Sequence, residues 1–380
     1  MTEQAKVPEI RFAGFTDPWE QRKLGELALT YSGGTPSAGN SAYYGGEIPF
    51  IRSAEIDCDS TELSLTVAGL NNSSAKLVDK GMVLYAMYGA TSGEVAISKI
   101  KGAINQAILA MDASDMAANR FIAYWLRRQK KSITETFLQG GQGNLSGAII
   151  KELGIPQPSL DEQRQIGSFF SNLDDLITLH QRKYDKLVIF KKSMLEKMFP
   201  KDGESVPEIR FAGFTDPWEQ RKFSEIVDVC SGRDYKHLDE GPIPVYGTGG
   251  YMTSVSEALS HNRDAIGIGR KGTIDKPYLL KAPFWTVDTL FYAIPKSDIN
   301  LEFALCSFLN VDWKSKDEST GLPSLSKESI NETVLSVPNV VEQNHLGNFF
   351  ADLDRLITLH QRKLELLQNI KKSLLDKMFV

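Results

Sequence analysis

The sequence contains few of the residues from which metal and redox sites are built. Its 380 residues include 3 cysteines and 5 histidines. Cys58, Cys230 and Cys306 are odd in number and widely separated, which is typical of free thiols and not of a disulfide framework or a zinc site. No run of 18 apolar residues occurs, and Met1 to Lys6 lack the apolar segment of a signal peptide. We therefore predict no bound metal and no membrane span, and we expect the chain in the cytoplasm.

Catalytic motifs are also missing. The segment from Gly267 to Gly272 matches the spacing GxGxxG, but it leads to Pro277, where a dinucleotide fold requires a helix. The same segment is not a phosphate-binding P-loop, because Thr273 stands where that loop has lysine. The sequence has no GxSxG, no HExxH and no cluster of cysteine and histidine. We predict that this chain has no catalytic residue and binds no cofactor of its own.

What the chain does contain is a large internal repeat. Seventeen residues recur without a change at an offset of 199, and 23 of 38 residues recur at an offset of 180. The segments between these matches, 24–161 and 223–341, share almost no sequence. A repeated frame around two different inserts is the pattern of a scaffold that carries two variable recognition domains. The matching segments are Val7–Lys23 with Val206–Lys222, and Glu162–Phe199 with Glu342–Phe379.

The longer repeated segment has the periodicity of an amphipathic helix. Apolar residues recur at alternating steps of four and three, which is the heptad pattern of a coiled coil. A helix of 38 residues is about 57 Å long at 1.5 Å per residue. Because an exposed apolar stripe is unfavourable in water, we predict that the two helices form an intramolecular antiparallel coiled coil. The predicted seam consists of Ile166, Phe170, Leu173, Ile177, His180 and Leu187 in the first helix, and Leu346, Phe350, Leu353, Ile357, His360 and Leu367 in the second.

A histidine interrupts each seam at the equivalent position. The midpoint of the first helical segment is 180.5, so an antiparallel pairing of the two full-length helices would place His180 beside His360. Polar seam residues can specify the register of a coiled coil at some cost in stability. Each ring can instead be a tolerated seam residue that packs with one face and keeps a nitrogen in water. The sequence leaves both interpretations open.

The two inserts have the patterns of mixed α/β domains. Short apolar runs between glycine-rich segments predict strands, and Phe121–Arg128 and Leu301–Leu309 predict helices. The unchanged 17-residue element predicts a structured lead-in before each insert, with Trp19 and Trp218 as buried anchors. We expect a pseudo-twofold repeat in four parts, which are a lead-in and recognition domain at 1–160, a helix at 161–200, a linker with the second lead-in and recognition domain at 201–340, and a C-terminal helix at 341–380.

The loops of the inserts are candidates for DNA contact, although the net charge of −5 argues against binding by long-range attraction alone. Arginine and lysine read guanine in the major groove, and asparagine and glutamine read adenine. A more basic partner is expected to supply much of the attraction to phosphate. Each candidate can instead be a solvated turn residue. The candidates are Arg52, Tyr88, Ser92, Gln142 and Asn144 in the first insert, and Arg233, Tyr235, Lys236, Arg270, Lys271 and Ser324 in the second.

Four kinds of segment follow one another in a specific order. They are the duplicated Pro-Glu-Ile-Arg-Phe-Ala-Gly-Phe-Thr-Asp-Pro-Trp-Glu, the turn Gly34–Ser37, Pro156–Gln163 before the first long helix, and Lys191–Phe199 at its end. Together they resemble the specificity subunit of type I restriction-modification enzymes, and the resemblance covers the whole chain. The second copy departs from the usual Pro-x-Pro-x-Leu-x-Glu-Gln, because it reads Val337-Pro-Asn-Val-Val-Glu-Gln343. This departure puts the junction between the second domain and its helix in doubt.

The resemblance implies a non-catalytic subunit with two target recognition domains, each reading one half of a bipartite site in double-stranded DNA. The helix pair would set the gap between the half-sites and dock two modification subunits, which bind S-adenosylmethionine and methylate adenine. Two restriction subunits, which use ATP and Mg²⁺, are implied as further partners. The residues alone leave two other classes open, a self-contained DNA methyltransferase and a coiled-coil scaffold with two protein-binding heads.

Overall fold

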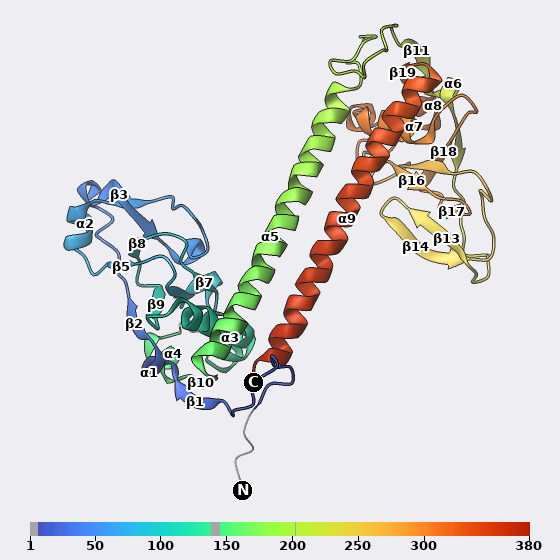
Figure 1. The fold of residues 1–380 in the computed structure, drawn as a ribbon. Coiled ribbons are helices and arrows are strands. Elements are labelled where there is room, and N and C mark those ends of the chain that lie inside the picture. The colour runs from blue at the N-terminus through green and yellow to red at the C-terminus, as the bar shows by residue number, and fades with distance from the viewer. Residues whose placement is uncertain (1–6, 138–144, 202) are drawn as a thin grey trace. The chain divides into compact units, whose positions relative to one another are not determined.

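The computed structural model describes residues 7–137, 145–201 and 203–380. The chain divides into two compact units, of which unit 1 contains Met1–His180 and Lys363–Val380, and unit 2 contains Gln181–Arg362. The two long helices are α5 (Leu160–Lys197) and α9 (Val340–Met378), and each contributes one end to each unit (Figure 1). Their lengths of 38 and 39 residues confirm the prediction of two long helices.

Unit 1 contains a mixed α/β domain, called domain 1 here, with two four-stranded sheets of order β2-β9-β6-β7 and β4-β3-β8-β5. Neighbouring strands are antiparallel except for the parallel pair of β3 and β8. The strands are β2 (Leu29–Ser32), β3 (Tyr44–Ile51), β4 (Ser64–Leu65), β5 (Lys76–Val78), β6 (Val83–Ala86), β7 (Val95–Ile97), β8 (Gly102–Ile104) and β9 (Ile108–Asp112). The helices are α1 (Leu24–Leu27), α2 (Val67–Asn71), α3 (Met116–Phe137) and α4 (Gly147–Glu152), with short 3₁₀ turns η1 (Ser41–Tyr43), η2 (Ser53–Glu55) and η3 (Gly89–Thr91).

The core of domain 1 lies on both faces of its first sheet. Side chains alternate along a strand, so Val83 and Tyr85 of β6 pack in the cluster that includes helix α3. Leu84 and Ala86 pack in a second cluster with Ile104 of the other sheet. Burial on both faces explains why β6 and β9 are continuous apolar runs in the sequence.

Unit 2 contains domain 2, which repeats this arrangement with sheets of order β12-β18-β15-β16 and β14-β13-β17. The pair of β13 and β17 is parallel, as is the pair of β3 and β8 in domain 1. The strands are β12 (Val227–Ser231), β13 (Ile243–Gly247), β14 (Gly250–Val255), β15 (Ala265–Gly269), β16 (Tyr278–Leu280), β17 (Trp285–Thr286) and β18 (Leu290–Pro295). The helices are α6 (Phe223–Ile226), α7 (Leu301–Asn310) and α8 (Lys327–Glu332), with the 3₁₀ turn η4 (Trp313–Lys316). The shared topology confirms that the inserts are two copies of one fold, and α3 and α7 confirm the two predicted domain helices.

The two lead-ins pack in the same way in their own units. Strand β1 (Glu20–Lys23) pairs with β10 (Gly154–Gln157), and β11 (Glu219–Lys222) pairs with β19 (Val334–Val337), both antiparallel. Trp19 is 7% exposed and Trp218 is 3% exposed, which confirms the predicted anchors. Ile10 donates its N–H to the carbonyl of Lys377 at 2.9 Å, and Ile209 donates to that of Lys197 at 2.8 Å. Each lead-in therefore caps the end of one long helix.

The starts of the long helices are also equivalent. The Gln163 side chain donates to the carbonyl of Pro158 at 2.9 Å, and that of Gln343 donates to Pro338 at 3.0 Å. The unusual Val337–Gln343 sequence therefore builds the same junction, because both contacts depend on a proline carbonyl and a glutamine that the two copies share.

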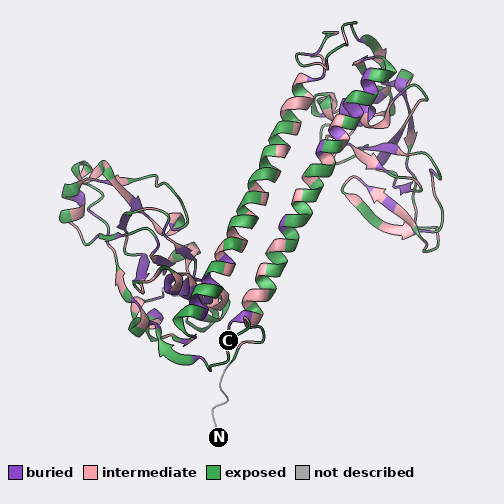
Figure 2. Cartoon of the chain, viewed as in Figure 1, coloured by how far each residue is buried: buried purple, intermediate pink, exposed green. Residues whose placement is uncertain are grey.

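The two long helices run antiparallel where their ends meet within each unit. Of the twelve predicted seam residues, Ile166, Phe170, Leu346, Phe350 and Leu353 are buried and the other seven are half-buried. Figure 2 shows this stripe along helices that are otherwise largely exposed. In unit 1, Phe170 packs on Phe379 and Asp174 pairs with Lys371. In unit 2, Phe350 packs on Phe199 and Asp354 pairs with Lys191.

The helix contacts are equivalent in the two units. The paired residue numbers sum to 170 + 379 = 549 and 174 + 371 = 545 in unit 1, and to 350 + 199 = 549 and 354 + 191 = 545 in unit 2. Within unit 2, Phe190 also packs on Phe349, at a sum of 190 + 349 = 539. The pairing of His180 with His360, at a sum of 540, stays a prediction.

Candidate nucleic-acid interface

Two of the predicted contact residues of domain 1, Tyr88 and Ser92, lie along one edge of its sheets. This edge, called loop edge 1, consists of the loops that follow β2, β6 and β8 and the segment before α4. Backbone hydrogen bonds hold the segments together, from Gly34 N–H to the Ile104 carbonyl at 3.2 Å and from Met87 N–H to the Ala107 carbonyl at 2.8 Å. The Met87 carbonyl in turn accepts from Leu145 N–H at 3.0 Å.

Domain 2 builds the same edge, called loop edge 2, from the loops that follow β12, β15 and β17 and the segment before α8. Arg233 N–H donates to the Thr286 carbonyl at 2.9 Å, and Arg270 N–H donates to the Thr289 carbonyl at 2.8 Å. Leu325 N–H donates to the Arg270 carbonyl at 3.0 Å. These bonds make Arg233 equivalent to Gly34, Arg270 to Met87, and Lys271 to Tyr88.

Glycines permit the close packing of both edges. A Cβ atom on Gly33 would lie 1.9 Å from the Ile104 carbonyl oxygen, and one on Gly232 would lie 2.0 Å from that of Val287. Gly89 and Gly272 have φ of 72° and 89°, so each turns the chain in the left-handed region directly after Tyr88 or Lys271. The backbone of the edge is therefore the same in both domains, while the side chains on it differ.

Three candidates of loop edge 2 come together around one cavity. Arg270, Lys271 and Ser324 line a cavity of about 390 Å³ together with Phe291. Lys271 and Ser324 form an antiparallel β-bridge. The Arg270 guanidinium carbon lies 5.8 Å from the centre of the Phe291 ring, a cation–π geometry.

Asp317 fixes the segment that carries Ser324. Its carboxylate accepts from the N–H groups of Ser324 at 2.9 Å and Ser319 at 3.0 Å, and from the Ser319 hydroxyl at 2.8 Å. These donors stabilise the ionised form, so they hold the pKa of Asp317 below its usual range. The segment before α8 thus keeps its shape at neutral pH without help from a ligand.

The other candidates of domain 2 lie in the loop that follows β12. The carbonyl of Arg233 accepts from the indole N–H of Trp285 at 2.9 Å, so the backbone of Arg233 is fixed on both sides while its side chain is exposed. Tyr235 is half-buried against the cluster that contains Trp285. Lys236 is exposed and makes no described side-chain hydrogen bond or ion pair. Arg233 is thus presented by a rigid backbone, whereas Tyr235 contributes to packing.

The candidates of domain 1 are less polar in their setting. Tyr88 is half-buried against the domain core. The Ser92 hydroxyl donates to the Met87 carbonyl at 3.0 Å and so holds its own loop. Gln142 and Asn144 lie outside the described residues. By sequence offset, Asn144 is the counterpart of Ser324, which lines the edge of domain 2.

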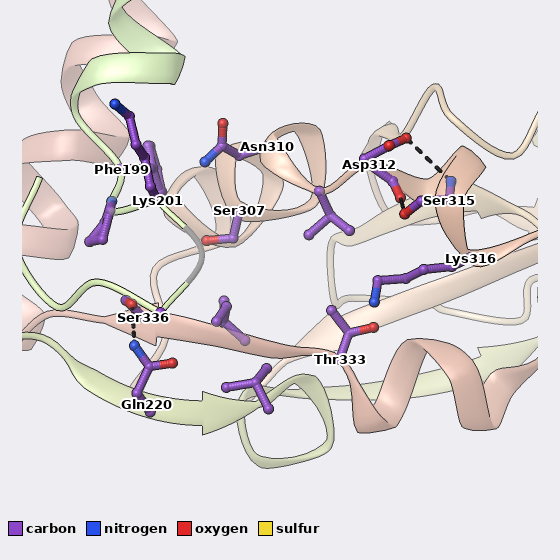
Figure 3. A pocket seen from close by; sticks show the side chains of 15 residues that line it. Phe199, Lys201, Gln220, Ser307, Asn310, Asp312, Ser315, Lys316, Thr333 and Ser336 are labelled. Atoms are coloured by element: carbon purple, nitrogen blue, oxygen red, sulfur yellow. Dashed lines mark hydrogen bonds between the residues drawn. The ribbon is translucent and has the colours of Figure 1, made fainter.

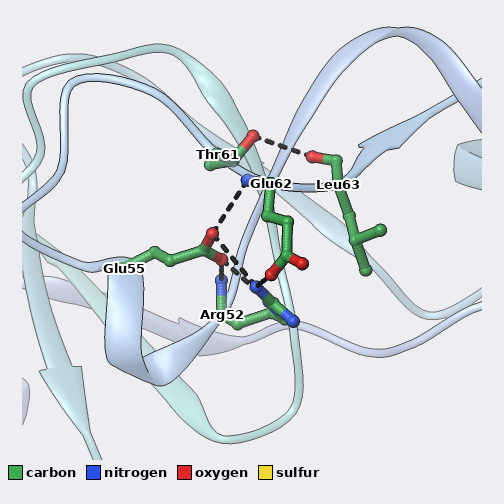
Figure 4. Close-up of polar contacts among 5 residues, drawn as sticks. All are labelled: Arg52, Glu55, Thr61, Glu62 and Leu63. Atoms are coloured by element: carbon green, nitrogen blue, oxygen red, sulfur yellow. Dashed lines mark hydrogen bonds and ion pairs between the residues drawn. The ribbon is translucent and has the colours of Figure 1, made fainter.

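Arg52 follows β3 beside loop edge 1, but carboxylates occupy its guanidinium. Its Nε donates to Glu55 at 2.9 Å, and a second nitrogen pairs with Glu62 (Figure 4). Glu55 also accepts the N–H of Glu62 at 2.9 Å. The hydrogen bonds to both carboxylates raise the pKa of Arg52, and the Arg52 partner lowers the pKa of Glu55. In this arrangement Arg52 shapes the 52–62 loop, and a base contact would require it to leave two carboxylates.

Lys327 was missed at the sequence level, although it lines the same cavity as Arg270. It is exposed and begins α8 directly after the capping residue Ser326, whose side chain accepts from Ser329 N–H. Its counterpart is Gly147, which follows the capping residue Ser146 of α4. The signal that could have identified Lys327 is the offset of 180 between these two caps.

A larger cavity, of about 560 Å³, lies beside the end of α5 in unit 2 (Figure 3). The stacking of Phe303 on Phe199 matches that of Phe121 on Phe379, so Ser307 is the counterpart of Trp125. The equivalent position thus holds a small serine in unit 2 and a buried indole in unit 1. The described lining of the cavity contains one carboxylate, that of Asp312, which accepts from the N–H groups of Lys314 and Ser315.

Within 7–137, 145–201 and 203–380, no group of three or more histidine, cysteine, aspartate or glutamate residues has the arrangement to hold a metal ion. Over the same residues, no helix combines the length and the apolar character that crossing a bilayer requires.

Comparison with known proteins places both copies of the repeat in one family. A family model described as "Type I restriction modification DNA specificity domain" matches residues 16–188 and 215–369. The type I restriction enzyme MjaVIII specificity subunit of Methanocaldococcus jannaschii is 21% identical over 402 aligned positions, covering 95% of this chain and 92% of that protein. The MjaIX specificity subunit of the same organism is 28% identical over 230 positions, covering 56% of this chain and 52% of that protein.

A solved structure supports the same fold. The crystal structure of a type I restriction-modification S subunit from M. genitalium has a TM-score of 0.68 with 20% identity, and the match covers 99% of each chain. The family matches span both lead-ins in part, both domains and most of both long helices, which is well over half of the chain. DNA sequence recognition is the general role of this family. The chain therefore belongs to the family of type I restriction-modification DNA specificity subunits.

Proposed function

We propose that this chain is the non-catalytic DNA-recognition subunit of a type I restriction-modification complex, in which domains 1 and 2 each read one half of a bipartite site. One observation carries the proposal. Equivalent backbone hydrogen bonds build the same loop edge in both domains, whereas the equivalent side chains differ, as in Met87 and Arg270. A constant backbone with variable side chains is what two readers of different sequences require.

Loop edges 1 and 2 are proposed as the surfaces that enter the DNA grooves. Contacts to phosphate position a protein on the duplex, and contacts to base edges give specificity. The backbone of each edge is fixed by hydrogen bonds, so little backbone freedom is lost when a side chain there meets a base. We propose that the recognition domains are joined to the long helices near residues 160, 200 and 340.

The long helices are proposed to set the gap between the half-sites and to dock two modification subunits. A second stripe with heptad spacing runs along each helix outside the seam. Leu176, Leu179, Leu356 and Leu359 of this stripe are between 40% and 47% exposed. Equivalent apolar residues exposed on both helices fit two copies of one partner.

We propose that the partner subunits carry out the catalytic steps. The modification subunits would bind S-adenosylmethionine and methylate adenine, and two restriction subunits would use ATP and Mg²⁺. The chain itself would bind none of these cofactors, and the complex would work in the cytoplasm.

Methylation mapping tests the proposal. The chain would be combined with its modification subunits, S-adenosylmethionine and a DNA library of random sequence, and methylated adenines would be located by sequencing. We expect a motif of two specified half-sites around an unspecified gap. Replacing residues 24–160 with those of a relative should change one half-site only. A continuous motif, or a change in both half-sites, would contradict two independent readers. Methylation by the chain alone would instead identify a self-contained methyltransferase.

The docking surface has its own test. Changing both Leu179→Glu and Leu359→Glu should abolish assembly with the modification subunits, measured by light scattering of the mixture, and leave the melting temperature of the chain almost unchanged. Val67→Glu changes an apolar residue that is even more exposed but lies on α2 of domain 1, so it serves as the control. Full assembly of the double variant would exclude this stripe as the docking site.

A further inference from the structure

Loop edges 1 and 2 differ sharply in charge. At four equivalent positions domain 2 has a cation where domain 1 has a neutral residue. The backbone hydrogen bonds establish three of these equivalences, and the matching caps Ser146 and Ser326 establish the fourth. The pairs are Gly34 with Arg233, Met87 with Arg270, Tyr88 with Lys271, and Gly147 with Lys327.

The four cations of loop edge 2 are available to a ligand. All four side chains are exposed, and none of them forms an ion pair with a carboxylate among the described residues. Glu318 lines the same cavity, but its carboxylate accepts the Ser326 hydroxyl at 2.8 Å. The arginine beside loop edge 1, Arg52, is by contrast held by two glutamates. An anionic duplex would therefore meet unpaired positive charge on domain 2 and not at the equivalent positions of domain 1.

Arg270 is the cation best placed to read a base. Its backbone is held on both sides, by the carbonyl of Thr289 and by the N–H of Leu325. The ring of Phe291 lies near its guanidinium, and its described side-chain hydrogen bond is a long one, 3.4 Å, to the Asp288 carbonyl. Most of its donors are free. The guanidinium fork matches the O6 and N7 acceptors of guanine in the major groove, whereas a lysine ammonium acts as a point charge that suits phosphate.

We infer that domain 2 reads a guanine through Arg270, with Arg233, Lys271 and Lys327 on the neighbouring phosphates, and that domain 1 reads its half-site without an equivalent cation. This inference rests on the proposed function and adds to it the base and the residue that recognises it. It predicts that the two half-sites differ in chemistry, because domain 1 has Met87 at the position that Arg270 occupies in domain 2.

The test is methylation mapping of the full chain with its modification subunits, with Arg270→Ala, Arg270→Lys and Arg263→Ala. The wild-type motif should contain guanine in one half-site. Arg270→Ala should lower discrimination for that guanine by about tenfold to a hundredfold and leave the other half-site unchanged. Arg270→Lys keeps the charge, so it should retain more affinity but not the discrimination. Arg263, which donates to the Pro295 carbonyl, lies at the opposite end of β15, so Arg263→Ala should keep the parental motif.

A second measurement separates phosphate contacts from base reading. Changing Arg233, Lys271 and Lys327 together to Gln should weaken binding to all sequences and lower the slope of log affinity against log salt by about 3. A motif in which neither half-site contains guanine, or an Arg270→Ala motif equal to that of the wild type, would overturn the inference and leave the proposed function intact. Absence of any sequence preference in the wild-type complex would overturn both.

Discussion

At the scale of single residues, one buried ion pair recurs in both units. Arg11 donates to both carboxylate oxygens of Glu162 at 2.6 and 2.8 Å, and Arg210 does the same to Glu342 at 2.7 and 2.8 Å. Glu162 and Glu342 are 0% and 1% exposed. Each pair ties a lead-in to the first turn of a long helix, so it connects a repeated sequence to a repeated joint.

Removing the cation of this pair should be costly. Arg11→Met leaves the buried Glu162 without a partner, and breaking a buried pair in this way typically costs about 3–5 kcal/mol. We expect a large fall in the free energy of unfolding by urea titration, and a similar fall for Arg210→Met. The control is Lys377→Ala, which removes an exposed pair with Glu9 and should cost less than about 1 kcal/mol. Equal effects for Arg11→Met and the control would show that the buried pair does not secure the joint.

Glu302 predicts a dependence of stability on pH. Burial raises the pKa of Glu302, with Asp354 and Asp264 adding to the rise and Lys281 and Lys191 opposing it. A carboxyl group with a raised pKa favours the folded state in its protonated form, so its contribution is lost as pH rises through the folded pKa. Glu302→Gln should therefore raise the melting temperature at pH 7, with a gain that shrinks toward pH 4.5. The exposed Glu257→Gln should show no such trend, and a gain independent of pH would contradict the account.

At the scale of elements, the helix register can be tested by cross-linking. The helix midpoints predict that His180 lies level with His360 in an antiparallel pair. With the native cysteines replaced, cysteines at 180 and 360 should therefore cross-link within one chain. Cysteines at 166 and 346, which a parallel pairing would bring together, should react poorly. Mass spectrometry of the digested chain distinguishes these products, and linking of 166 to 346 without linking of 180 to 360 would show that the predicted register is wrong.

The sequence predicts the long helices and their seam, but the heptad pattern alone does not single out one register, for a physical reason. A heptad pattern over 38 residues is a strong periodic signal, so helix and seam follow from it. The same pattern repeats every seven residues, so pairings that sum to 540 and to 547 align the seam equally well. The choice depends on packing at the helix ends, where Phe170 meets Phe379 and Phe350 meets Phe199. Those contacts involve the folded domains and are not encoded in the period.

The candidate interface was predictable only in part. Arg270, Lys271 and Ser324 were identified because they lie in glycine-rich or polar loops. Arg270 and Ser324 are 54 positions apart in the sequence. They share one cavity because of the sheet order and the hydrogen bond from Leu325 to Arg270, which no local pattern specifies. Arg52 resembled the other candidates in sequence, but its acidic neighbours Glu55 and Glu62 engage it. Loop composition identifies possible contacts, and the fold decides which side chains remain free.

At the scale of the whole molecule, the ends of the chain allow a circular permutation. In unit 2, eleven residues, 198–208, join Lys197 to Ile209, which are linked by a backbone hydrogen bond. In unit 1, the equivalent bond joins Lys377 to Ile10. Fusing Val380 to Thr2 would place residues 378–380 and 2–9, again eleven, between them. The fused connection therefore has the length of the natural one.

We expect a permuted chain with this fusion, and with new ends between Asp202 and Gly203, to fold, to assemble with modification subunits and to methylate the parental motif. Circular dichroism and methylation mapping provide the measurements. A matched control opens the chain inside β6, between Leu84 and Tyr85, and should not fold, because both residues are fully buried. Failure of the first permutant under conditions that fold the parent would show that the two lead-in connections are not equivalent.

We propose that the long helices carry two independent readers and set the distance between their half-sites. Inserting one heptad after Lys183 and one after Lys363 keeps both seams in phase. The insertion points are equivalent in the two copies of the repeat, because 363 − 183 = 180. The insertion lengthens the helix pair by about 10.5 Å, or roughly 3 base pairs at 3.4 Å each. Because the added length also rotates one half-site around the duplex, binding can weaken while the half-sites stay the same.

The most direct measurement is therefore methylation mapping of this double-insertion variant, with its modification subunits, on a DNA library in which every gap length occurs. We expect unchanged half-sites separated by a gap about 3 base pairs longer than that of the parent. An active variant that keeps the parental gap would show that the helices do not set this distance.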